Sequence, residues 1–186
     1  MPAHKRVIYY TLATIATAGL IFQIGHFLEH TVQFGVWLFG DRTAPWMSAP
    51  VMELVHMVGA YYFPTADMAR QMSAGMEILH LIGNTIFLTT LLSLLYFIRS
   101  KWVRYAFYVE MFHLYEHISL TLSIIYLGKP IGFSTLFGAS VPLLGSQLAI
   151  GYRVFWHFIM NFVPSALFMM GAKEHWAKIK ARQSDS

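Results

Sequence analysis

The stretch ADMARQMSAGMEILHLIGNTIFLTTLLSLLYFI, residues 66–98, carries the pattern from which the predicted fold class follows. Its second half, residues 85–98, is an uninterrupted apolar run, and a membrane-spanning helix needs roughly 20 mostly apolar residues. Its first half places Glu77 three residues before His80, a spacing that puts both side chains on one face of a helix. The stretch therefore predicts a helix that lies in a bilayer and carries ionisable groups inside it.

Three other segments of the 186-residue chain have a similar apolar character. We expect membrane spans at residues 7–39, 66–98, 102–127 and 151–170. The sequence thus predicts an all-α integral membrane protein with four transmembrane helices in a bundle. By its length the chain forms one transmembrane domain, residues 1–186.

Two shorter apolar segments are too short or too irregular to cross a bilayer. Residues 49–63 are bracketed by Pro50 and Pro64, and they predict a short interfacial or re-entrant helix near residues 50–62. Residues 132–145 are rich in Gly, Ser and Pro, and we expect a second interfacial or re-entrant loop there.

The composition separates this chain from soluble proteins. It is 56% hydrophobic and 12% charged, whereas soluble domains are about 25% charged. It contains no cysteine, which excludes disulfides, thiolate metal ligands and a cysteine nucleophile. The net charge of +4 comes from basic residues at the ends of apolar runs, so it indicates membrane topology rather than binding of nucleic acid.

The positions of the basic residues predict the orientation. Lys5 and Arg6 precede the first span, residues 99–104 connect the second and third, and a basic tail, residues 173–186, follows the fourth. The positive-inside rule places these three regions on the cytoplasmic side. We therefore expect an integral protein of the bacterial plasma membrane with cytoplasmic N- and C-termini.

Histidine and glutamate occur together along the chain. Five of the six Glu stand near a His at helical spacing, within three Glu-x-x-His and two His-x-x-Glu-His patterns. An ionisable group at mid-bilayer costs at least ~2.5–3.5 kcal/mol, so such a set needs partners, and a metal cation is the most economical one. The candidate metal ligands are His26, Glu29, His30, Glu53, His56, Glu77, His80, Glu110, His113, Glu116, His117 and His157.

The Glu-x-x-His pattern has a known use in helical bundles. In dinuclear carboxylate proteins two helices each supply Glu-x-x-His and two others each supply Glu. By analogy we expect two transition-metal ions, iron first and then copper or zinc. Haem b, with His80, His117 and His157 as eligible ligands, and a metal-free His/Glu hydrogen-bond network are the alternatives.

Several functions are open on this basis. The first is an oxygen-dependent oxidoreductase with a His/Glu-ligated dinuclear metal centre, acting on an apolar or membrane-soluble substrate. The second is a b-type cytochrome or quinone-linked subunit. The third is a non-enzymatic accessory subunit that handles metal or protons in a larger membrane complex.

The sequence also indicates which partners the chain needs. The chain lacks a glycine-rich nucleotide loop, so we expect a partner protein or other electron donor besides the lipid bilayer. A homo-oligomer is a further alternative.

The spacings His26/His30 and His113/His117 are similar to the first histidine box of membrane fatty-acyl hydroxylases and desaturases. Their His-x-x-His-His box is absent, so the chain is not assigned to that family.

Overall fold

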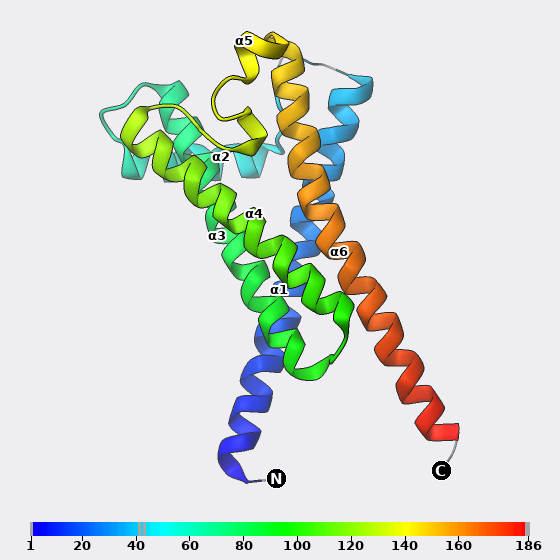
Figure 1. Ribbon diagram of the computed structural model, residues 1–186. Helices are drawn as coiled ribbons and strands as arrows, with labels where there is room; N and C mark the ends of the chain where they lie inside the picture. The colour runs from blue at the N-terminus through cyan, green and yellow to red at the C-terminus, as the bar shows by residue number, and fades with distance from the viewer. Residues whose placement is uncertain (1, 41, 43, 185–186) are drawn as a thin grey trace.

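The computed structural model describes residues 2–40, 42 and 44–184, and this part of the chain is helical without a β-strand. Its long helices are α1 (Ala3–Phe39), α3 (Met68–Phe97), α4 (Lys101–Leu127) and α6 (Ser146–Ser184). The shorter ones are α2 (Ala49–Tyr62), the 3₁₀ helix η1 (Phe133–Thr135) and α5 (Ser140–Leu144). Figure 1 shows both termini and the α3–α4 connection toward one end of the bundle, and η1 and α5 at the other. The all-α prediction is confirmed.

Three of the described helices are long and apolar enough to cross a membrane. They are α1, α3 and α6, which agree with the first, second and fourth predicted spans. Helix α4 falls outside this set, although its bounds agree closely with the third predicted span. The described part of the chain therefore has three helices with the length and composition of membrane spans.

Local signals set the helix ends. Helix α3 begins at Met68, two residues later than expected, because the Asp67 side chain accepts a hydrogen bond from the Arg70 N–H at 2.9 Å and caps the helix. Helix α4 ends at Leu127, because the next residue, Gly128, has a φ of 71°, in the left-handed region that glycine enters without steric cost.

Helix α6 is longer at both ends than the predicted span 151–170. It begins at Ser146 and includes most of the basic tail, because no helix-breaking sequence separates the tail from the span. Residues 185–186 of that tail lie outside the described residues.

Helix α2 occupies the segment where a short interfacial or re-entrant helix is expected. It lies against the N-terminal half of α3, and two glycines allow the close approach (Figure 1). A Cβ atom on Gly75 would overlap the Val55 carbonyl oxygen, and one on Gly59 would overlap the Gln71 carbonyl oxygen. The two backbones are therefore in direct contact at this crossing.

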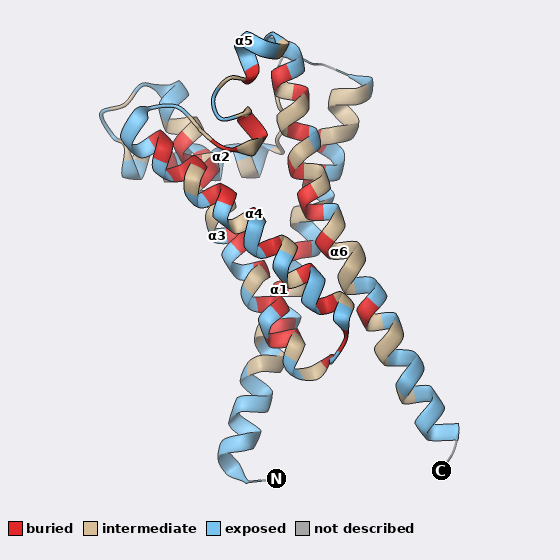
Figure 2. Cartoon of the chain, in the orientation of Figure 1, coloured by how far each residue is buried: buried red, intermediate tan, exposed pale blue. Residues whose placement is uncertain are grey.

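The interior has an apolar part and a polar part. The apolar core is built by seven buried residues from α1, α3, α4 and the connection between α3 and α4: Ala16, Phe87, Leu91, Leu94, Ile98, Val103 and Ala106. Figure 2 shows further buried positions on these helices farther from the termini. Most of these buried residues are polar. Most of the predicted metal ligands lie in the polar part.

Candidate metal centre

Six of the nine histidines meet inside the bundle. The distances between the centroids of neighbouring rings are 4.6–6.3 Å. We call these six residues the histidine cluster: His26 and His30 from α1, His80 from α3, His113 and His117 from α4, and His157 from α6. Each long helix therefore contributes at least one imidazole.

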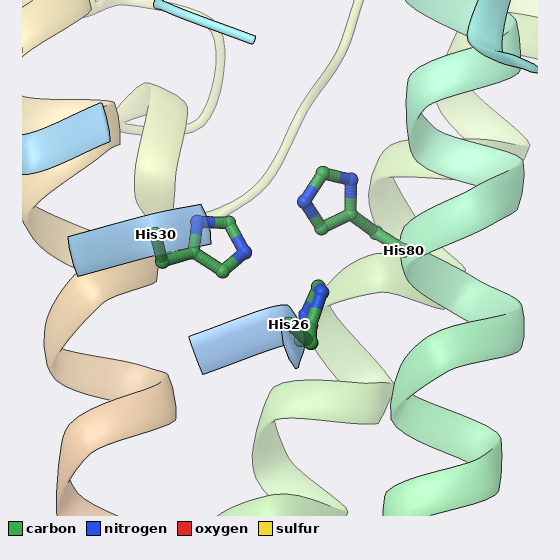
Figure 3. A group of neighbouring side chains, drawn as sticks. All are labelled: His26, His30 and His80. Atoms are coloured by element: carbon green, nitrogen blue, oxygen red, sulfur yellow. The ribbon is translucent and has the colours of Figure 1, made fainter. Parts of the chain in front are cut away.

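The first group within the cluster is His26, His30 and His80. One ring nitrogen of each lies within 4.8 Å of those of the other two. Figure 3 shows the three rings gathered around a common space between α1 and α3. His30 is buried, and the other two are partly buried. This arrangement can hold a metal ion.

The second group is His113, His117 and His157, and all three are buried. The ring centroid of His117 lies 4.9 Å from that of His113 and 5.1 Å from that of His157. His80 connects the two groups, because its ring is 5.0 Å from His117 and 5.4 Å from His157. The two groups are therefore parts of one continuous cluster.

In four of the six histidines the Nδ1 atom is bound to an oxygen. His80 and His157 donate from Nδ1 to the backbone oxygens of Met76 and Arg153, both at 2.8 Å. His30 Nδ1 lies 3.2 Å from Gln33 Oε1, and His117 Nδ1 lies 3.1 Å from Glu77 Oε2. Because these oxygens act as acceptors, Nδ1 carries the proton and Nε2 keeps a free lone pair. Metal-binding histidines almost always have such a partner for the second ring nitrogen.

His113 and His117 face each other through Nε2 atoms 3.2 Å apart. His117 Nε2 holds a lone pair, so in metal-free protein His113 must donate from its own Nε2. His113 Nδ1 is then an acceptor, 3.5 Å from the Glu110 carboxylate. With His113 neutral and Glu110 ionised, two acceptors face each other in a fully buried place, which is unfavourable. A proton taken up by either group relieves this, and so does a cation at the Nε2 side that lets Nδ1 carry the proton.

Several buried polar atoms of the cluster have no hydrogen-bond partner in the described part of the chain. They are His26 Nε2, His30 Nε2, His113 Nδ1 and both carboxylate oxygens of Glu110. Each unsatisfied buried group costs about 1–3 kcal/mol, and more when it is charged. These atoms lie on histidines of the cluster or on Glu110 beside it, and they are free to bind a ligand.

The glutamates lie around the cluster rather than at its centre. Glu77 accepts from His117 and forms a partly buried ion pair with Arg153. Glu110 stands behind His113. Glu116 accepts from the Ser134 N–H at 2.7 Å and from Trp156 Nε1 at 2.5 Å.

The remaining candidates lie outside the cluster. Glu29 accepts from the backbone N–H and the hydroxyl of Ser48 through its Oε1 atom. Glu53 and His56 are exposed on α2, so the structure does not bring them to the cluster.

Two polar residues that support the cluster were missed by sequence reasoning. Arg153 pairs with Glu77 and supplies the carbonyl that binds His157. Gln33 holds His30, and its own amide nitrogen donates to the Trp46 carbonyl at 2.9 Å. A lone cation four residues before His157 was a usable signal, because a charge at the start of a membrane span is conspicuous.

The fold and this cluster define an all-helical protein with a buried, imidazole-rich centre shared by four helices. The chain belongs to a family of unknown function, DUF6008, whose model matches residues 2–185. No curated protein and no solved structure matches it.

Proposed function

We propose that this chain is a membrane metalloprotein whose histidine cluster binds two transition-metal ions. One ion would be held by His26, His30 and His80, and the other by His113, His117 and His157. The observation that carries the proposal is the orientation of the imidazoles. Four of the six Nδ1 atoms are bound to oxygens, which leaves the Nε2 lone pairs for ligation.

The charge of the site supports the same proposal. Glu77 is neutralised by Arg153, but Glu110 has no Lys or Arg partner among the described residues. Imidazoles together with a buried acidic side chain that has no basic partner favour a cation in the cluster. Imidazole is a good ligand for iron, copper and zinc. In this arrangement Glu77 and Glu110 orient His117 and His113 rather than bind metal themselves.

We further propose that the protein is an oxygen-dependent oxidoreductase that acts on an apolar substrate. Two neighbouring redox-active ions would supply two-electron chemistry with dioxygen. A mostly apolar pocket of about 580 Å³ opens beside His26, His30 and His80, and this supports an apolar substrate. The chain's own part is to bind this substrate next to the first histidine group and to hold the imidazoles in position.

The proposal includes α4 as a fourth membrane span. The ionisable groups of α4 at positions 110, 113, 116 and 117 are all buried in the bundle. Its outward face carries apolar and aromatic side chains, including Tyr115, Ile118 and Leu122. Charged residues in membrane spans almost always face the bundle interior in this way. With four spans, the basic regions and both termini lie together on the cytoplasmic side.

Metal analysis of the purified protein tests the metal centre. We expect about two equivalents of iron or copper per chain in protein purified without chelators. His30→Ala and His113→Ala should each lose metal, and His56→Ala, with its exposed imidazole on α2, should keep it. Wild-type content in both cluster variants would contradict the proposal, as would metal-free wild-type protein.

The identity of the metal tests the reaction. Iron or copper, together with oxygen consumption in the presence of an apolar reductant, is expected of an oxidoreductase. Two equivalents of zinc would overturn the redox assignment while leaving the site intact. One iron with the absorption spectrum of haem b would replace the proposal with a b-type cytochrome.

A further inference from the structure

The pocket beside the first histidine group lies between α1, α2 and α3 and has a volume of about 580 Å³. Cofactor and substrate pockets have volumes of about 300–1,000 Å³ and combine apolar walls with a few polar groups. Here the walls include Phe22, Met47, Leu54 and Met76, and the polar groups lie on α1 and α3.

Two glycines leave space for an occupant. A Cβ atom on Gly25 would meet no other atom within 4 Å, although Gly25 lies on the pocket wall. A Cβ atom on Gly83 would touch the Phe22 ring at 3.4 Å. Larger residues at position 25 would therefore extend into the pocket without disturbing the helix packing.

The pocket has a hydrogen-bond acceptor with spare capacity. Glu29 Oε1 accepts from the Ser48 N–H at 3.2 Å and from the Ser48 hydroxyl at 3.3 Å. Its second oxygen, Oε2, has no donor among residues 2–40, 42 and 44–184. Gln33, which also lines the pocket, already uses its amide oxygen for His30 and its amide nitrogen for Trp46. A ligand that donates a hydrogen bond could therefore bind to the Glu29 Oε2 atom.

We propose that this pocket binds a bilayer-soluble hydroquinone whose ring hydroxyl donates to the Glu29 carboxylate. The ring and its substituents would lie against Phe22, Met47 and Met76, because thioethers and aromatic rings make favourable contacts. A hydroquinone can give up two electrons and two protons, which matches a centre of two metal ions. That redox role rests on the proposed function, whereas binding in the pocket does not.

The test uses isothermal titration of the whole protein in lipid nanodiscs with tetramethylhydroquinone, kept reduced under argon. The 1,4-dimethyl ether of this probe has the same ring and cannot donate a hydrogen bond. The wild type should bind the hydroquinone at least tenfold more tightly than the ether. Glu29→Gln should reduce this preference, because an amide nitrogen replaces one acceptor oxygen.

A matched pair of variants locates the site. Gly25→Leu should weaken binding of the hydroquinone at least tenfold, because its side chain fills the pocket. Gly35→Leu adds the same side chain to α1 at a position that also has nothing within 4 Å and does not line the pocket, so it should bind as the wild type does. Both variants should retain the wild-type metal content.

Two results would overturn the inference: equal affinity of wild type and Gly25→Leu, or equal affinity of wild type for hydroquinone and ether. Metal-bearing protein that does not bind the probe would contradict this inference alone. Metal-free wild type that binds the probe with the expected preference would contradict the proposed function alone.

Discussion

The imidazole rings of His80 and His117 lie parallel, with 4° between their planes and 5.0 Å between their centroids. They come from different helices and belong to the two different three-histidine groups. His117 is in turn held by Glu77, which is paired with Arg153. A single line of contacts therefore runs from α6 through α3 and α4 to the junction of the two groups.

The Glu77–Arg153 ion pair gives a first prediction. Glu77→Gln removes the counter-charge of the partly buried Arg153, and the cost should lie between the ~0–1 kcal/mol of a surface pair and the ~3–5 kcal/mol of a fully buried one. The midpoint of thermal unfolding in detergent should fall clearly. The double variant Glu77→Gln/Arg153→Gln should lose less than the sum of the two single changes. Strict additivity would show that the two side chains do not stabilise each other.

Glu110 gives a second prediction: its replacement should stabilise the metal-free protein but weaken metal binding. Glu110→Gln replaces a buried carboxyl group that has no Lys or Arg partner in the described chain by an amide that can donate to His113 Nδ1, so the metal-free protein should become more stable. Metal affinity should fall about 10–100-fold, as is typical when the partner of a metal-binding histidine is lost. Thermal unfolding of stripped protein and competition with a chelator measure the two effects. An unchanged affinity would place Glu110 outside the centre.

The α2–α3 crossing gives a third prediction. Gly75→Ala places a methyl group against the Val55 carbonyl, so α2 must move, and overpacking of this kind costs about 1–3 kcal/mol. Gly35→Ala adds the same methyl group where nothing lies within 4 Å, and it should be neutral or stabilising by up to about 1 kcal/mol. Thermal unfolding of the two variants side by side checks this contrast.

The absence of cysteine allows a fourth prediction, on the number of spans. Single cysteines at Thr65, Lys129 and Arg182 can be labelled in intact cells with a membrane-impermeant maleimide. Four spans place positions 65 and 129 outside, so these should react at once, and position 182 should react only after permeabilisation. If α4 does not cross the membrane, position 182 will react together with position 65.

Much of the helical organisation could be predicted because it depends on local sequence. Apolar runs and helix-breaking residues determine the bounds of α1, α3 and α4 to within a few residues. A spacing of four residues keeps His26 and His30 on one face of α1, and His113 and His117 on one face of α4. Their meeting point follows from the similar depth at which they lie in the long helices.

The rest depends on contacts between distant segments. Glu53 and His56 have the same local spacing as Glu77 and His80, yet they are exposed, because α2 turns Val55 and Gly59 toward α3 instead. Arg153 and Gln33 each have one partner on their own helix, but their other partners, Glu77 and Trp46, lie across the bundle or beyond the end of a helix. Spacing within one helix carries no information about such partners.

Helices α1 and α6 contain 37 and 39 residues. At 1.5 Å per residue they are about 55 and 58 Å long, nearly twice the ~30 Å thickness of the hydrocarbon layer. Figure 1 shows them diverging toward the end that carries both termini. The two ends are therefore separate from each other, and fluorescent reporters fused to the two termini would be held apart. Energy transfer between the reporters would then report any change in the angle between the two helices.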